Sequence, residues 1–336
     1  MTTAAGPATY REAIRQALLD AMEADPSVIL LGEEVGLYGG AYGVTKGLID
    51  LFGAHRVIDT PISEPAIVGA AVGAAMTGLR PVAELMYVDF AGLAMDQIAN
   101  QAAKSRYMFG GQIGVPMVLR TQGGTGRSAA AQHSQSLEAW MMHVPGLRLV
   151  MPGTVNDAYH LLRAAIEDPD PVVVIEHKGL YTMKGWLDPA RPDAPWGQPV
   201  LRREGRDLVI LTYSRMLHES LAAAERLSEA GVEAAVIDLR CLNPLDEAPL
   251  VEAVRRTGRA MVVTEAVVTG SVASEIAARL GELCFDWLEE PILRLGSEEI
   301  PVPVAPALER GSIPSAELIH DTALWLVTRK APPWAA

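Results

Sequence analysis

The chain has 336 residues, of which 49% are hydrophobic, and its formal net charge at pH 7 is −13. This length predicts about two domains, and the charged fraction of 21% gives no sign of disorder. The negative charge argues against nucleic acid or an anionic membrane surface as a partner.

The sequence also favours a soluble, cytoplasmic protein. No uncharged apolar run reaches the ~20 residues that span a bilayer, and the first residues lack the charged start and apolar core of a signal peptide. Cys241 and Cys284 lie far apart, without CxxC spacing. They fit thiols in a reducing compartment better than a disulfide framework.

Strands and helices alternate through the first half of the sequence. Thr9 and Glu12 have the spacing of a capping box at a helix start. Apolar periodicity predicts strands at 28–31, 57–60, 81–85, 115–121, 147–151 and 171–176, and helices at 9–24, 63–78, 91–108, 156–167 and from about 136. This alternation is typical of an α/β domain with a mainly parallel sheet.

A proline-rich stretch, 186–205, lacks periodicity and predicts a linker. The alternation restarts after it, with strands predicted at 208–212, 234–239, 260–265 and 292–295, and helices at 216–230, 245–256, 271–288 and from about 315. We therefore expect a second α/β domain, whose parallel sheet is covered on both faces.

Several candidate functional residues follow predicted strands. Glu64 is expected in the first turn of a helix, at the strand end where ligand crevices form in open α/β sheets. Glu33, Phe90 and His133 also follow strands. Each has an ordinary explanation as well. An acid in a first turn complements the helix dipole, Glu33 beside Glu34 fits solvated loop charge, Phe90 fits core packing, and His133 fits a hydrogen-bonded loop residue.

The helix at 63–78 holds Gly69, Gly73 and Gly78 among alanines. Glycine inside a helix costs roughly 1 kcal/mol relative to alanine, so a compensating reason is needed. Small side chains let another helix or subunit approach closely, and we expect this helix to be buried on most faces.

Two further segments combine functional and ordinary interpretations. The glycine-rich loop at 123–128 lacks the Gly-Lys-Ser/Thr ending of a P-loop, which favours tight turns near a ligand or a neighbouring chain. The turn at 168–171 gathers carboxylates and carbonyls, which hard cations prefer. A plain surface turn is the commoner explanation for it.

Longer strings of the sequence resemble one family. They are GEEV (32–35), RVIDTPISE (56–64), GAAVGAAMTGLRPVAELMYVDF (69–90), DQIANQAAKSRYM (96–108), AAQHSQSLEAWMMHVPGLRLVMP (130–152), DPVVVIEHK (170–178) and VIDLRCLNPLD (236–246). In this order, over nearly the whole chain, they resemble the beta subunit of the thiamine-diphosphate-dependent decarboxylating component of 2-oxo acid dehydrogenase complexes.

The resemblance implies a pyrimidine-binding thiamine diphosphate domain over 1–185, the linker over 186–205, and a transketolase C-terminal-type domain over 206–336. It implies an alpha2-beta2 heterotetramer formed with an alpha subunit, and a dihydrolipoyl acyltransferase core as a further partner. The GDG…N motif, which grips magnesium and the cofactor diphosphate, does not occur in this sequence. Those ligands are therefore expected on the alpha subunit, and the chain is expected to be inactive alone.

The resemblance also implies roles for the candidate residues. Glu64 matches the glutamate that contacts N1′ of the cofactor's aminopyrimidine ring, where a buried carboxyl group shares a proton with the ring. Phe90 matches the aromatic residue that packs on that ring, and Ile62 an apolar residue of the same pocket. Glu33 matches an acid in the polar path between two active sites. His133 matches a histidine near the substrate, suited to proton transfer or to acyl transfer onto lipoamide.

A potassium site is implied as well, built largely from backbone carbonyls. Its matching positions are Ala165, Ile166, Asp168 and Asp170, with residues around Val115, Met117 and Val118. Pro169 and Asp170 depart from the asparagine-like pair that the family usually has there.

The substrate stays open between related alternatives. The strings ELMYVDF and NQAAKSRYMFGG look closest to the pyruvate and acetoin branches, with pyruvate favoured and the branched-chain 2-oxo acid branch as a further alternative. A non-catalytic relative that only assembles with partners is the rival from another class.

Overall fold

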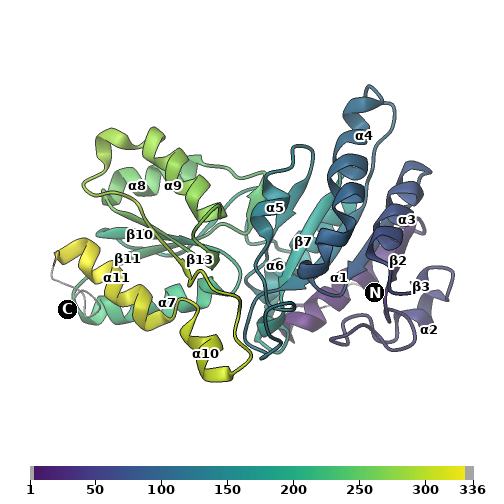
Figure 1. Ribbon diagram of the computed structural model, residues 1–336, viewed down its shortest axis with the longest axis horizontal. Coiled ribbons are helices and arrows are strands. Elements are labelled where there is room, and N and C mark those ends of the chain that lie inside the picture. The colour runs from purple at the N-terminus through teal and green to yellow at the C-terminus, as the bar shows by residue number, and fades with distance from the viewer. Residues whose placement is uncertain (1–3, 330–336) are drawn as a thin grey trace. The chain divides into compact units, whose positions relative to one another are not determined.

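The computed structural model describes residues 4–329. The chain folds into two compact units (Figure 1). The first comprises the residues up to Gly124 together with Trp140–Trp196, and the second comprises Thr125–Ala139 together with the residues from Gly197 onward. The two units are described separately.

The first unit is built on parallel strands in the order β6-β7-β5-β4-β2-β3. Every residue of β2, β5 and β7 is buried, because helices cover both faces of the sheet. The strands span Val28–Gly32 (β2), Val57–Asp59 (β3), Arg80–Leu85 (β4), Val118–Gly123 (β5), Arg148–Val150 (β6) and Val172–His177 (β7).

Helices connect these strands in the predicted alternation. They are α1 (Tyr10–Ala24), α2 (Leu48–Phe52), α3 (Glu64–Met76), α4 (Ala103–Met108), α5 (Glu138–Met142) and α6 (Val155–Glu167), with the short 3-10 turn η3 (Lys178–Leu180). The connections β3–α3–β4 and β6–α6–β7 move in opposite directions along the sheet. Right-handed crossovers therefore place α3 and α6 on opposite faces. The capping box predicted for α1 is confirmed, since Thr9 accepts from the Glu12 amide and Glu12 accepts from the Thr9 amide at 2.7 Å.

The glycine-rich helix α3 is only partly buried, unlike our expectation. Ile67, Val68, Ala71, Val72 and Ala75 face the core. The opposite stripe of small residues is exposed in the single chain: Ala66, Ala70, Gly73 and Thr77. A Cβ added at Gly69 would lie at an ordinary contact distance, 3.6 Å, from the Gln97 side chain, and one added at Gly73 or Gly78 would meet none of the described atoms within 4 Å, so the expected close approach is not seen within the single chain.

The helix predicted at 91–108 is three helical segments. A 3-10 helix, η1 (Val88–Ala94), leads into a π-helix, η2 (Asp96–Ala102), and then into α4. Apolar periodicity does not distinguish these forms, because they differ by less than one residue per turn from the α-helix over such short lengths.

The three strands β1, β8 and β9 escaped the sequence prediction because they are short and mixed in polarity. β1 (Gly6–Thr9) pairs antiparallel with β8 (Lys184–Leu187) in the first unit. β9 (Val200–Arg203) pairs with β11 in the second unit. Within the stretch 186–205, residues 186–187 thus belong to β8 and residues 200–203 to β9.

The second unit has a sheet in the order β14-β13-β10-β11-β9, parallel except for the β11–β9 pair. In Figure 1, α8 and α9 lie on one side of β10, β11 and β13, and α7 and α11 lie on the other. The predicted mainly parallel α/β fold is thus confirmed in both units. The elements are β10 (Leu208–Thr212), α7 (Met216–Glu229), β11 (Ala234–Asp238), β12 (Cys241–Asn243), α8 (Ala248–Thr257), β13 (Ala260–Val267), α9 (Val272–Leu283), η4 (Phe285–Trp287), β14 (Leu293–Ser297), α10 (Pro306–Gly311) and α11 (Ala316–Thr328).

The segment Thr125–Ala139 packs with the second unit, although the sequence prediction placed it within 1–185. Periodicity reports local conformation, and this loop carries no apolar pattern that would show which sheet it joins. Across residues 4–329, no helix has the length and apolarity needed to cross a bilayer.

Candidate active site

Three of the predicted site residues leave the same edge of the first sheet. Glu33 follows β2, Glu64 follows β3, and Phe90 follows β4. Strand β2 lies between the other two, with Gly32 paired to Asp59 on one side and to Glu84 on the other. Parallel strands end at one edge, so the three side chains start from neighbouring positions at the carboxyl edge, where ligands bind in open α/β sheets.

Glu64 and Glu33 are buried carboxyl groups that interact with each other. Glu64 is the first residue of α3 and is 7% exposed. Its position places the carboxyl group beside the amide groups of the first helical turn. Glu33 is also 7% exposed. Burial raises the pKa of Glu33, and the charge of Glu64 raises it further. A pair of this kind is suited to holding and passing a proton.

The loop after β2 is fixed by Asp59, a residue that the sequence analysis passed over. The Asp59 carboxylate accepts from the amide of Gly36 at 2.6 Å and from that of Leu37 at 3.1 Å. A Cβ added at Gly36 would lie 2.8 Å from the same carboxylate, so this close approach requires glycine. Glu34 has a φ of 58°, a left-handed conformation that costs energy for a residue other than glycine. The loop therefore presents Glu33 in a conformation held by Asp59.

Phe90 lies at the end of a series of aromatic rings. It is half-buried in η1, and the Tyr87 ring meets it edge to face at a centroid distance of 5.8 Å. Tyr42 meets Tyr87 in the same way at 6.4 Å, and the two hydroxyl oxygens are 3.2 Å apart. Tyr42 also packs on Tyr181, with centroids 4.9 Å apart. The Phe90 ring is therefore positioned by neighbours that are themselves in contact.

Beneath these rings lies a buried ionic cluster that the sequence analysis did not predict. Arg120, on β5, donates to both carboxylate oxygens of Glu176 at 2.5 and 2.7 Å, and it also contacts Glu84 on β4. The Tyr181 hydroxyl donates to Glu176 at 2.6 Å. Gln122 donates to the carbonyl of Met86, close to the Phe90 segment.

The carboxyl groups of the ionic cluster act on one another as well as on Arg120. Burial raises the pKa of Glu84; Arg120 opposes this effect, whereas Glu176 and Glu33 add to it. A charged residue inside an otherwise apolar strand is the sequence signal for such a cluster, because a buried charge needs a partner. The strings PVAEL, VLRTQ and VVVIEH each contain one.

These residues fit the aminopyrimidine end of thiamine diphosphate. Glu64 offers a buried carboxyl group, Phe90 a half-buried flat ring, and Thr60 a buried hydroxyl oxygen for which the described residues supply no hydrogen-bond partner. Ile62, matched to the same pocket, is 80% exposed in the single chain. Within residues 4–329, no group of three or more His, Cys, Asp or Glu side chains is placed to hold a metal ion.

His133 belongs to the second unit, on the segment Thr125–Ala139, whereas Glu33, Glu64 and Phe90 belong to the first. It is half-buried, and its amide donates to the carbonyl of Ala130 at 3.3 Å. In the glycine-rich loop that precedes it, the amides of Thr125, Gly126 and Ser128 have partners within the chain. Buried glutamates of the same unit accept hydrogen bonds from those amides.

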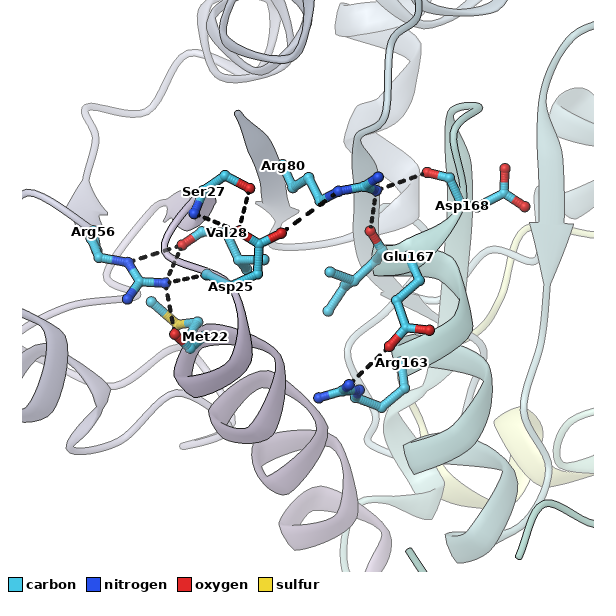
Figure 2. A network of polar contacts seen from close by, with 10 residues as sticks. Met22, Asp25, Ser27, Val28, Arg56, Arg80, Arg163, Glu167 and Asp168 are labelled. Atoms are coloured by element: carbon cyan, nitrogen blue, oxygen red, sulfur yellow. Dashed lines mark hydrogen bonds and ion pairs between the residues drawn. The ribbon is translucent and has the colours of Figure 1, made fainter. Parts of the chain in front are cut away.

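The positions matched to potassium lie at the opposite edge of the first sheet. Asp168 and Asp170 precede β7, and Arg80 begins β4, so all three lie at the amino ends of strands. Arg80 Nη1 donates to the carbonyls of Ile166 at 2.7 Å and Asp168 at 3.1 Å (Figure 2). Arg80 also faces the Asp25 carboxylate at 3.8 Å.

Other arginines neutralise the carboxylates of this turn. Arg148 pairs with Asp168 at 3.0 Å and with Asp170 at 3.1 Å, and Arg106 pairs with Asp170 at 2.8 Å. Two carbonyl oxygens that converge on one guanidinium nitrogen have the donor type of a potassium site, and each keeps a second lone pair. In the described chain, arginine side chains therefore supply the cationic partners of this turn.

Comparisons with known proteins agree with this architecture. The family model "Transketolase, pyrimidine binding domain" matches residues 6–184, and "Transketolase, C-terminal domain" matches residues 197–319. The fold is shared with a split-gene transketolase described as an inactive beta4 tetramer, at a TM-score of 0.79 and 21% identity over 98% of this chain and 100% of that one.

Curated relatives match over nearly the whole length. The chain is 43% identical to subunit beta-2 of the mitochondrial pyruvate dehydrogenase E1 component of Oryza sativa subsp. japonica, covering 98% of this chain and 89% of the relative. It is 45% identical to the beta subunit of the acetoin:2,6-dichlorophenolindophenol oxidoreductase of Cupriavidus necator, covering 93% and 95%. It is 44% identical to the beta subunit of the 2-oxoisovalerate dehydrogenase of Bacillus subtilis, covering 90% and 93%. The chain belongs to the family of beta subunits of the pyruvate, acetoin and 2-oxoisovalerate dehydrogenases, built from transketolase pyrimidine-binding and C-terminal domains.

Proposed function

We propose that this chain is a catalytic beta subunit. With an alpha subunit it carries out thiamine-diphosphate-dependent oxidative decarboxylation of a 2-oxo acid, for which pyruvate is our first choice, and it transfers the acyl group to lipoamide. The observation that carries the proposal is the buried Glu64 at the start of α3, whose charge acts on Glu33. Glu33 follows β2, which pairs with β3 on one side and, on the other, with β4, the strand that leads to Phe90. A subunit that only assembles with partners needs no such arrangement.

Thiamine diphosphate, when bound, supplies the electron sink for the decarboxylation. The protein's part is to orient the cofactor and to manage its protons. In our proposal, the Glu64 carboxyl group hydrogen-bonds the N1′ atom of the aminopyrimidine ring and shares its proton. Phe90 packs against the face of that ring. Glu33, which holds its proton to a higher pH than usual, exchanges protons with this site.

His133 is proposed to act at the substrate end, in proton transfer or in transfer of the acyl group to lipoamide. Its loop belongs to the second unit, where Glu265 and Glu309 bind the loop backbone. The role of His133 rests on the family resemblance. Magnesium and the diphosphate group are assigned to the alpha subunit, because the GDG…N motif does not occur in this sequence.

A potassium ion is proposed at the turn between α6 and β7. The carbonyl oxygens of Ile166 and Asp168 would hold it, together with those of Ala165 and Asp170. Its role there would be structural, because the turn lies at the amino edge of the sheet and Glu64 follows a strand at the carboxyl edge.

The partners follow from the same proposal. The exposed small-residue stripe of α3 suits close packing against a neighbouring subunit. We propose an alpha2-beta2 heterotetramer that docks on a dihydrolipoyl acyltransferase core. The cytoplasmic location predicted from the sequence stays a prediction.

The decisive experiment joins the chain to its alpha subunit and compares Glu64→Gln with the wild type. Proton exchange at C2 of bound thiamine diphosphate is expected to fall by about 10²–10⁴-fold, the usual contribution of a positioned acid or base. Cofactor affinity should change much less. Glu34→Gln is the matched control, because Glu34 is the exposed neighbour of Glu33. Wild-type exchange in Glu64→Gln would remove Glu64 from the mechanism.

The same preparation separates the substrate alternatives. Reduction of an artificial electron acceptor is measured with pyruvate, with acetoin and with 2-oxoisovalerate, since relatives named for all three activities share 43–45% identity with this chain. Turnover with acetoin or 2-oxoisovalerate alone would move the chain to that branch. An absence of turnover with all three would favour the assembly subunit.

A further inference from the structure

The segment that carries His133 is held at both ends by buried glutamates of the second unit. Glu265 and Glu309 bind its first residues, and Glu138 anchors its end. These three side chains are 8%, 3% and 1% exposed, respectively. Buried carboxylates require strong partners, and here much of the partner set is the segment's own backbone.

Glu309, from α10, binds the amide groups of the glycine-rich loop. Its Oε1 accepts from the Gly126 amide at 2.9 Å and from the Ser128 amide at 3.2 Å, and its Oε2 accepts from the Ser128 amide at 3.1 Å. The Ser128 hydroxyl lies 3.5 Å from Oε2. The amides of Gly126 and Ser128, two residues apart, thus converge on one carboxylate, as backbone amides do in the nests that bind oxyanions.

Glu265, from β13, holds the residue before this nest. Its Oε1 accepts from the Thr125 amide at 2.6 Å and from the Thr125 hydroxyl at 2.8 Å. Arg215 donates to the same hydroxyl oxygen at 3.1 Å. A Cβ added at Gly126 would lie 3.1 Å from the Arg215 guanidinium, and Gly126 has a φ of +93°. The Arg215 guanidinium therefore leaves little room for a side chain at Gly126.

The far end of the segment is anchored by Glu138. The Tyr213 hydroxyl donates to Glu138 at 2.7 Å, and the Thr264 hydroxyl lies 3.5 Å from the same oxygen. Burial raises the pKa of Glu138, although these hydrogen bonds oppose the effect. The residues around His133 therefore lie between two anchored ends, one bound by Glu265 and Glu309 and the other by Glu138.

The backbone between these points is strained. Ser128 has a φ of 53° and Ala130 a φ of 63°, left-handed conformations that side chains rarely adopt. Such conformations persist only where the surroundings determine them. At Ser128 the determinant is visible, since its amide points to both oxygens of Glu309. Ala130 in turn supplies the carbonyl that accepts from the His133 amide.

We propose that Glu309 is a positioning residue for His133, acting as a built-in anion in a nest formed by the amides of Gly126 and Ser128. The nest requires a carboxylate or a similar small oxyanion, and without one the loop loses the conformation that presents His133. The catalytic part of this statement rests on the proposed function of His133. The anion requirement of the loop does not depend on that function.

The test uses the chain assembled with its alpha subunit and compares Glu309→Ala, Glu309→Gln and the wild type. Hydrogen exchange of the peptide covering 125–135 is expected to be at least about tenfold faster in Glu309→Ala, because two backbone amides lose their acceptor. Glu309→Gln keeps one acceptor oxygen and should fall between the two. Glu282→Ala, which changes an exposed glutamate near the end of α9, is the control.

Small anions provide the specific readout. Formate or acetate is expected to slow exchange in Glu309→Ala, with choline chloride at the same ionic strength as the reference. Lipoamide acylation should be slower in Glu309→Ala with the apparent affinity for thiamine diphosphate unchanged, and formate should restore part of the rate.

The outcomes separate this inference from the proposed function. Wild-type exchange in Glu309→Ala would overturn it, and so would faster exchange that neither formate nor acetate reverses. If His133→Ala acylates lipoamide normally, the role of His133 fails, whereas an anion-dependent exchange rate still establishes the nest.

Discussion

The carboxylates of Glu33 and Glu64 come from the ends of two adjacent strands, and the charge of Glu64 raises the pKa of Glu33 beyond the effect of burial. The two acids therefore resist being ionised together.

Replacement of Glu33 by glutamine should stabilise the chain at neutral pH. The pKa of Glu33 is higher in the folded chain than its ordinary value of about 4.3. Its stabilising contribution is therefore complete below about pH 4.3 and is lost as the pH rises through the folded value. We expect the melting temperature of Glu33→Gln to exceed that of the wild type at pH 7, and the difference to shrink towards pH 4.5.

Calorimetry of the isolated chain between pH 4.5 and pH 8 measures this difference, with Glu34→Gln as the exposed control. A difference that is the same at every pH would show that charge on Glu33 does not oppose folding.

Arg120→Met should be strongly destabilising. The substitution leaves Glu84 and Glu176 buried without their cation, and breaking a buried ion pair costs about 3–5 kcal/mol. Urea unfolding measures the loss. The comparison is Arg163→Met, which removes an i,i+4 pair with the exposed Glu167 and should cost about 0.5 kcal/mol or less. Equal losses in the two variants would mean that the buried cluster contributes no more than a surface pair.

Potassium should stabilise the chain more than sodium or choline at equal ionic strength. A ligand at ten times its Kd adds about 1.4 kcal/mol, which corresponds to about 2 °C or more for a chain of this size. Thermal unfolding in the three chloride salts is the measurement. Identical melting temperatures would leave Arg80 as the cation that serves the carbonyls of Ile166 and Asp168.

His133→Ala should slow substrate processing or lipoamide acylation by about 10²-fold, the lower range for a positioned acid or base. Affinity for thiamine diphosphate should be little changed, because the proposed contacts with the aminopyrimidine ring come from Glu64 and Phe90. Titration of the cofactor into the assembled enzyme, together with single-turnover acylation, separates the two effects. A large loss of cofactor affinity would contradict the assigned role.

Local sequence signals predicted much of the first unit. The Thr9 and Glu12 spacing located the start of α1, and the position of Glu64 directly after an apolar strand placed it in the first turn of α3. These features depend on residues a few positions apart. Because β-α-β connections are right-handed, a correct order of strands and helices then leads to a parallel sheet.

Contacts between distant residues were beyond the sequence analysis. Arg120 meets Glu84 and Glu176 only because β5 lies between β4 and β7. In the sequence, Glu64 and the residues matched to potassium are alike in lying next to a predicted strand. Strand direction separates them, because one set precedes its strand and the other follows it.

The backbone passes between the two units three times, after Gly124, after Ala139 and after Trp196. A fragment that starts at Gly197, where the C-terminal family match begins, would lack the segment 125–139. Glu265 and Glu309 would then lose the hydrogen bonds that they accept from the amides of Thr125, Gly126 and Ser128. The C-terminal family match therefore leaves out a segment that packs with the second unit. A clean separation of this protein into two pieces would have to transplant fifteen residues from the middle of the chain as well.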